Sequence, residues 1–113
     1  DFIFSSDVVA LYARIAERLS NEPTQFRGRA YNAGTNQPRT VREVLELIFK
    51  KCRNEQALEV ILQQMRTART TGELSIQYMD FDVVQSDFGW TPSTNFEDGI
   101  DQTISWFERY LAH

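Results

Sequence analysis

Apolar side chains recur at helical spacing over residues 6–19, where they gather on one face while charged side chains fall on another. Ser5 or Ser6 can cap the first turn of this helix, and Asp7 suits its positive end. A proline follows at position 23, so we expect the helix to end just before it. The apolar face consists of Val8, Tyr12, Ile15, Ala16 and Leu19.

A capping box opens the clearest helix of the chain. Thr40 and Glu43 stand three residues apart, so each can satisfy a free amide at the helix start. Because Cys52 lies in the apolar stripe of this helix, it is predicted to be a small buried side chain. The stripe contains Val41, Val44, Leu45, Ile48, Phe49 and Cys52.

Another amphipathic helix is predicted over about residues 96–111. Before it, Asp80 is expected to cap a short helix that Gly89 ends. Trp90 follows that glycine and Trp106 lies on the last helix, so both are interpreted as packing residues rather than ligand-stacking ones. The core face of the last helix is predicted to carry Phe96, Ile100, Ile104, Phe107 and Leu111.

Three stretches fit short strands. Residues 29–33 form an extended run, and residues 74–79 alternate between apolar and polar side chains. Residues 58–63 fit either a strand or a helix, and periodicity alone leaves both open. Residues 67–72 read as an exposed loop. The strand pattern consists of Leu58, Val60 and Leu62, and the helix pattern of Leu58, Ile61, Leu62 and Met65.

Composition restricts the function. The 113 residues suffice for one small domain or a piece of a larger one. A formal net charge of −4 without a basic run argues against a nucleic-acid partner, because phosphate binding needs clustered Lys and Arg. One cysteine and one histidine give no disulfide and no metal site. No apolar run is long enough to cross a bilayer and no signal peptide is visible, so we expect a cytoplasmic protein without a membrane partner.

Three blocks follow one another along the chain: residues 1–9 (DFIFSSDVV), residues 30–34 (AYNAG) before the capping box, and residues 77–107. The third block contains QYMD, FGWTP, FEDGI and TISWF. Their order and spacing resemble the C-terminal portion of the extended short-chain dehydrogenase/reductases, the NAD-dependent nucleotide-sugar epimerase/dehydratase family. Residues 72–78 are most similar to its CDP-glucose 4,6-dehydratase-like members.

The resemblance implies an α+β fold that is mostly helical, with a small sheet of short strands. It favours a strand at residues 58–63. Residues 1–113 are then a single partial domain, the substrate-binding C-terminal subdomain, with the N-terminal Rossmann domain outside this chain. The opening DFIF also reads like the middle of a domain.

Catalysis by this chain alone is not expected. The five glycines are too scattered for the glycine-rich turn that holds NAD, so no cofactor is assigned to this chain, although the full-length family uses NAD. The family's catalytic tyrosine has a lysine four residues later, and none of the four tyrosines here does. We therefore expect a nucleotide-sugar-binding subdomain that is not catalytic by itself, and assign no catalytic residue.

The candidate substrate-binding residues are Asn32, Arg66, Arg69 and Glu73. Asn32 matches the asparagine that lies beside the nucleotide in the family, but it can equally turn the chain before Gly34. Arg66 and Arg69 could bind phosphate and Glu73 ribose hydroxyls, whereas solvated surface charge explains each of them as well.

A second hypothesis is a stand-alone truncated homologue that acts as a structural or protein-interaction module. Apolar surface left uncovered by a missing Rossmann domain would mark an association site. The expected partners are therefore a nucleotide diphosphate sugar, bound weakly, and either that Rossmann domain or further copies of this chain in a homo-oligomer.

Overall fold

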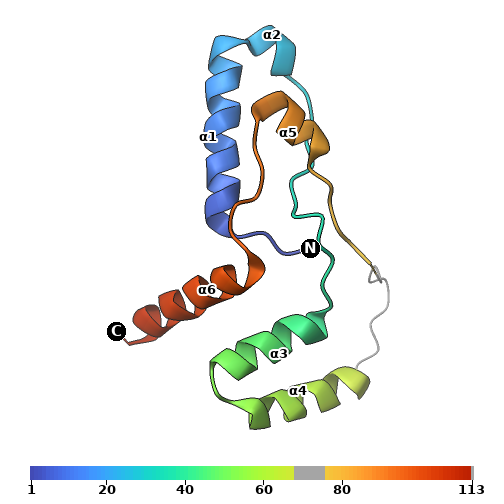
Figure 1. Cartoon of the computed structure of the whole chain (residues 1–113), viewed down its shortest axis with the longest axis vertical. Coiled ribbons are helices and arrows are strands. Elements are labelled where there is room, and N and C mark those ends of the chain that lie inside the picture. Colours follow the sequence, from blue (N-terminus) through green and yellow to red (C-terminus); the bar gives the residue numbers. More distant parts are fainter. Residues whose placement is uncertain (68–75, 113) are drawn as a thin grey trace. The chain divides into compact units, whose positions relative to one another are not determined.

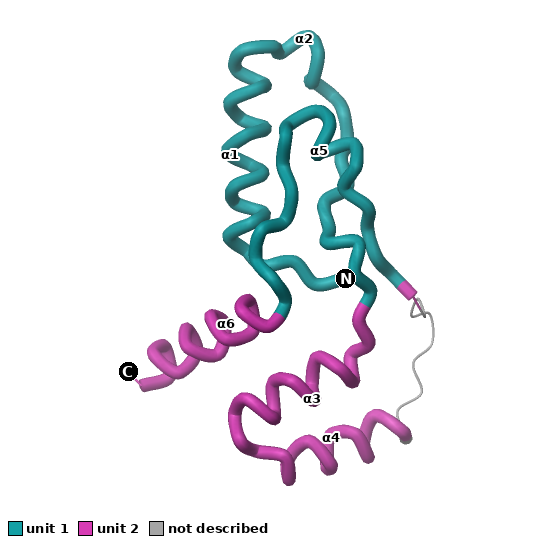
Figure 2. The backbone as a smooth tube through the Cα atoms, in the orientation of Figure 1, with its two compact units in different colours: residues 1–38, 77–96 teal, residues 39–76, 97–113 magenta. Residues whose placement is uncertain are grey.

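The computed structural model describes residues 1–67 and 76–112. Within these residues every regular element is a helix and none is a strand (Figure 1). The chain divides into two compact units (Figure 2). Unit 1 contains residues 1–38 and 77–96, and unit 2 contains residues 39–76 and 97–113.

Unit 1 is built around the first helix. Helix α1 (Ser5–Asn21) packs against α2 (Pro23–Phe26) and against α5 (Asp82–Phe88). Their apolar faces close a small core, to which α1 contributes Leu11 and Ile15. The buried residues of this core are Leu11, Phe26, Val84, Phe88 and Trp90, and Ile3, Ile15, Tyr31, Ala33 and Phe81 pack against them.

A buried carboxylate joins α1 to the segment after α5. Asp7 is only 4% exposed. Its Oδ1 accepts hydrogen bonds from the Ser93 hydroxyl (2.7 Å) and amide (3.2 Å), and its Oδ2 accepts from the Thr94 amide at 3.1 Å. The indole of Trp90 donates to the Asp7 carbonyl oxygen at 2.9 Å. The predicted packing position of Trp90 is therefore confirmed, and Asp7 fixes the chain on both sides of it.

A side chain of α1 also stabilises the end of α5. Gly89 ends the helix in the left-handed conformation, with φ 62°, as the sequence predicts. Arg14 Nη1 donates to the carbonyl oxygens of Phe88 and Gly89, at 3.3 and 3.2 Å. A cation at this place satisfies carbonyls that the helix leaves without partners.

Unit 2 contains α3 (Val41–Lys51), α4 (Glu55–Thr67) and nearly all of α6 (Phe96–Leu111). The predicted capping box of α3 is confirmed: the Glu43 amide donates to Thr40 Oγ1 at 3.1 Å, and the Thr40 amide donates to Glu43 Oε2 at 2.6 Å. The hydrogen bonds that the Thr40 amide and hydroxyl donate to the Glu43 carboxylate lower its pKa. Helices α3 and α4 pack together, with Val44 and Leu62 buried. Lys51 pairs with Asp101 of α6 at 2.7 Å.

The predicted α+β class is wrong for the described residues, because the expected small sheet has no strand there. Residues 58–63 belong to α4, where Leu62 is buried and Val60 is 59% exposed, as a helical stripe requires and a strand alternation does not. Residues 29–33 and 76–79 are extended without strand pairing. Residues 74 and 75 of the strand predicted at 74–79 lie outside the described residues. So do residues 68–72 of the loop predicted at 67–72.

Several local predictions also fail. Of the face predicted for α1, Tyr12 is 67% and Leu19 36% exposed, and the buried position is Leu11 instead. Phe81 and not Asp80 is the N-cap residue of α5, without a side-chain cap. On the predicted core face of α6, Phe107 and Leu111 are exposed.

Helix α1 begins after Phe4 with no side-chain cap, so neither Ser5 nor Ser6 is the capping residue. Cys52 is exposed, because α3 ends at Lys51 and the turn carries the thiol out of the stripe. Trp106 is 51% exposed although it was predicted to pack in the core.

We expect the replacement Asp7→Asn to destabilise the protein by about 2 kcal/mol, because it leaves buried donors without a charged acceptor. Burial raises the pKa of Asp7, but the hydrogen bonds from Ser93 and Thr94 outweigh this effect and hold the pKa below its usual value. A lowered folded-state pKa contributes stability that is present above the unfolded pKa and lost as the pH falls through the folded one.

Urea unfolding followed by tryptophan fluorescence should therefore show a stability contribution of Asp7 that is constant from neutral pH to about pH 5 and is lost progressively as the pH falls below about 4, through the lowered folded pKa. The variant Glu59→Gln removes an exposed carboxylate from α4 and serves as the control. An Asp7→Asn protein that unfolds at the same urea concentration as the unmodified chain would contradict this assignment.

Candidate functional site

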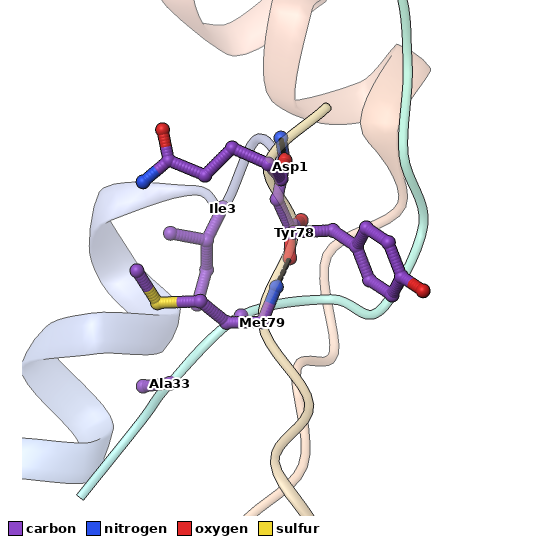
Figure 3. A pocket seen from close by; sticks show the side chains of 7 residues that line it. Asp1, Ile3, Ala33, Tyr78 and Met79 are labelled. Carbon is purple, nitrogen blue, oxygen red and sulfur yellow. Dashed lines mark hydrogen bonds between the residues drawn. The ribbon is translucent and has the colours of Figure 1, made fainter. Parts of the chain in front are cut away.

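Three extended segments of unit 1 meet around a hollow of about 280 Å³. They come from the start of the chain, from the stretch before Thr35 and from the stretch before α5 (Figure 3). The residues that line the hollow are Asp1, Ile3, Ala33, Gly34, Gln77, Tyr78 and Met79. Stretches more than thirty residues apart in sequence thus form one small site.

The Asp1 carboxylate holds the segments together. Its two oxygens accept from the Thr35 amide at 3.2 and 3.1 Å, and the Thr35 hydroxyl donates to Oδ1. Oδ2 also accepts from the Met79 amide at 3.0 Å, and the Asn36 amide donates to the Met79 carbonyl oxygen at 3.1 Å. These bonds occupy the acceptor positions of a carboxylate, so Asp1 has a structural function here.

Gly34 permits the close approach of two segments. A Cβ atom at this buried position would lie 2.7 Å from the Met79 carbonyl oxygen and 2.8 Å from the Met79 Cβ, and would also meet Asp1 Oδ2. Such contacts are shorter than van der Waals packing allows. The site therefore requires a residue without a side chain at position 34.

Successive side chains of an extended segment point to opposite sides. Figure 3 shows Ile3 and Met79 together on one side, with the Tyr78 ring pointing away from them. Gln77 and Met79 are two residues apart in an extended segment, so they belong to the same side. The hollow thus offers aliphatic and thioether surface together with one amide that can both donate and accept.

The hollow carries little charge. Asp1 supplies a carboxylate, and neither Arg nor Lys lines it. Behind it, the Tyr31 hydroxyl donates to Asp87 Oδ2 at 2.8 Å, and Arg29 pairs with the same oxygen at 3.3 Å. Burial, and then the bond to Asp87, raises the pKa of Tyr31. Tyr31 therefore stays protonated at neutral pH and anchors the segment that carries Ala33 and Gly34.

The candidate residues of the sequence analysis lie elsewhere. Asn32 is exposed beside the hollow without lining it, because its neighbours Tyr31 and Ala33 turn toward the core. Arg66 is exposed in the last turn of α4, in unit 2. Arg69 and Glu73 lie outside the described residues. The structure consequently places Asn32 and Arg66 in different units and gives neither a contact with this hollow.

Sequence reasoning missed the residues that build the hollow. The alternation predicted over residues 74–79 put Ile76 and Tyr78 on one side, and Gly34 marked the end of the second segment. Nothing in the sequence connects Asp1 to Thr35 and Met79, because hydrogen bonds between distant segments leave no periodic signal.

The part of the chain that the structure describes offers neither a metal site nor a membrane span. No group of three His, Cys, Asp or Glu side chains is arranged to hold a metal ion. None of the described helices is long and apolar enough for a membrane span.

The chain is similar to a protein of known sequence over most of its own length. The chain is 22% identical to Protein CapI of Staphylococcus aureus over 122 aligned positions, which cover 97% of this chain and 35% of CapI. It thus spans about a third of the length of that relative. No protein-family model and no solved structure matches the chain significantly.

The identification with the C-terminal subdomain of the extended short-chain dehydrogenase/reductases is therefore wrong. That subdomain implies a small sheet, and the described residues contain no strand. The sequence blocks behind the resemblance are individually short, and caps and glycine ends also occur in helical domains. The comparison supports a weaker statement: nearly the whole of this chain is similar to a part of CapI.

We expect Gly34→Ala to destabilise unit 1 by about 1–3 kcal/mol, because the added methyl group pushes the segments of the hollow apart. Gly28→Ala is the control: nothing lies within 4 Å of the corresponding Cβ position, so it reports only the cost of a φ of 79°. In amide NMR spectra, Gly34→Ala should shift the Thr35 and Met79 signals, while Gly28→Ala leaves them unchanged. Equal spectra for the two variants would exclude the close approach.

Proposed function

We propose that this chain is a non-catalytic module that binds a nucleotide diphosphate sugar, with one uncharged ring of the ligand in the hollow of unit 1. The observation that carries the proposal is the lining of the hollow, which combines Ile3, Ala33 and Met79 with the amide of Gln77. Small-molecule sites typically join a mostly apolar surface with a few polar groups that fix the ligand's orientation.

Sugar and base rings suit such a lining. Each has an apolar face, and each carries hydroxyl, amine or carbonyl groups at its edge. Ile3 and Met79 would contact the face, and the Gln77 amide would bind the edge, since it can donate and accept at once. Asn32 is exposed next to Ala33 and would offer a second amide to the part of the ligand outside the hollow.

The size and charge of the hollow indicate which part of the ligand enters. Its volume of about 280 Å³ is at the lower end of the range for small-molecule sites. It therefore suits one ring rather than a complete nucleotide sugar. Neither Arg nor Lys lines the hollow, so the diphosphate has no cationic partner in it and would lie outside.

The chemistry of such a ligand would depend on residues outside this chain. Only two lysines occur in the sequence, Lys50 and Lys51, and both belong to the last turn of α3 in unit 2. The tyrosine nearest to the hollow, Tyr78, is followed four residues later by Asp82. A proton relay from tyrosine to lysine is thus not available within the sequence, and the module would bind without reacting.

The alternative function, a protein-interaction module, is favoured by a different observation. Large apolar side chains remain uncovered at the end of α6 in unit 2. This surface shares no residue with the hollow, so the two functions can be tested separately.

Isothermal titration calorimetry should detect weak binding of CDP-glucose or UDP-glucose and no binding of NAD. Gln77→Ala should weaken sugar-nucleotide binding roughly tenfold, because it removes hydrogen bonds worth about 1 kcal/mol each. Gln63→Ala removes the same amide from the exposed surface of α4 and should leave the affinity unchanged.

Two results would contradict the proposal. One is the absence of heat with every sugar nucleotide at millimolar concentration. The other is an equal loss of affinity in Gln63→Ala and Gln77→Ala, which would place the ligand away from the hollow. Free glucose and inorganic diphosphate, titrated separately, would show which part of the ligand contributes the binding energy.

A further inference from the structure

Asp1 contacts the segment before α5 on both sides of Tyr78. Its main-chain nitrogen donates to the Gln77 carbonyl oxygen at 3.0 Å, and its Oδ2 accepts from the Met79 amide at 3.0 Å. In an extended segment the orientation of the backbone decides to which side each side chain points. Asp1 therefore fixes the backbone of Gln77 and Met79, two residues whose side chains share the side of the hollow.

The same carboxylate joins this segment to the stretch that ends at Gly34. Both of its oxygens accept from the Thr35 amide, at 3.2 and 3.1 Å, and the Asn36 amide donates to the Met79 carbonyl oxygen at 3.1 Å. All of these residues belong to unit 1, so the clamp is complete within that unit. Asp1 thus holds two walls of the hollow at once.

The Asp1 carboxylate has no acceptor position left for a ligand. Its positions are occupied by the amides of Thr35 and Met79 and by the Thr35 hydroxyl. Any effect of Asp1 on binding must therefore act through the side chains that it orients. Gln77 is the important one, because its side chain is long and exposed, and a ligand would otherwise have to order it.

We infer that Asp1 is a positioning residue of the hollow, which directs Gln77 and Met79 toward the ligand before it binds. This role rests on the proposed function, because it concerns binding in the same hollow. A site whose side chains are already in place avoids the free-energy cost of ordering them during binding. Loss of the Asp1 carboxylate should consequently weaken binding although it removes no contact with the ligand.

A double-mutant cycle tests whether Asp1 acts through Gln77. NMR titration of the full chain with UDP-glucose gives the affinities of the unmodified protein, of Asp1→Ala, of Gln77→Ala and of the double variant. Asp1→Ala alone should weaken binding about tenfold. In the Gln77→Ala background it should weaken binding less than about threefold, because the side chain that Asp1 orients is then absent.

Gln63→Ala provides the matched background for this cycle. It removes an exposed amide from α4 in unit 2, so Asp1→Ala should retain its full effect there. The conservative variant Asp1→Asn keeps one oxygen that can accept from the Met79 amide, and should restore part of the affinity. Urea unfolding followed by tryptophan fluorescence measures the stability of each variant separately from its affinity.

A second measurement needs no ligand. In NMR spectra of the unmodified chain, the side-chain amide signals of Gln77 should differ from those of the exposed Gln63. Asp1→Ala should move the Gln77 signals toward the Gln63 values, because the carboxylate anchors residue 1 and its loss also releases the main-chain bond to Gln77.

Three results would overturn the inference: an additive cycle, Gln77 side-chain signals that do not respond to Asp1→Ala, or an affinity that only follows the loss of unfolding free energy across the variants. In each of these cases UDP-glucose still binds the unmodified chain, and the proposed function stands. Absence of UDP-glucose binding to the unmodified chain would instead overturn the proposed function, and the role of Asp1 in binding with it.

Discussion

The buried Asp7 carboxylate is the interaction on which unit 1 depends. A charged group leaves water only when hydrogen bonds replace its hydration, and here Ser93 and Thr94 supply them. The same residue accepts the Trp90 indole through its carbonyl oxygen, so the largest side chain of the core is fixed in position by the first turn of α1. Trp90 directly follows Gly89, the residue that ends α5, so this contact also fixes the position of α5. The segment that enters the hollow leads into α5 and is positioned with it.

A second carboxylate, that of Asp1, holds together the segments around the hollow. In a sheet, neighbouring extended segments are joined by repeated bonds between their backbones. Here, among the described residues, Asp1 joins Thr35 and Met79 through its side chain, and Asn36 adds one backbone bond to Met79. A few such bonds suffice because Gly34 allows the segments to approach within a distance that a side chain would prevent. The described parts of these segments are therefore adjacent without forming strands, and the prediction of strands there is wrong.

Local features were predictable from the sequence, and long-range ones were not. The capping box of Thr40, the glycine end of α5 and the helix over residues 96–111 each depend on a few neighbouring residues, and the structure confirms them. The sequence of residues 58–63 fits both the period of a strand and the period of a helix. In the structure they form a helix that packs against α3 and buries Leu62. The candidate site was predicted less well. Asn32 lies beside the hollow, Arg66 lies in the other unit, and Asp1 had no signal at all, because its partners are 34 and 78 residues away.

Helix α6 shows that a hydrophobic period predicts an apolar helix face but not the surface that covers this face. The spacing of Phe96, Ile100, Ile104, Phe107 and Leu111 states that one face of the helix avoids water, but it does not state what covers that face. The first half of the stripe is partly buried and the second half is exposed, although the pattern does not change between them. Exposing several large side chains has a free-energy cost that rises with their apolar area, and a second apolar surface removes this cost wherever it comes from. An amphipathic helix therefore specifies a contact, and the identity of the partner has to be found from the shape and charge of the uncovered part.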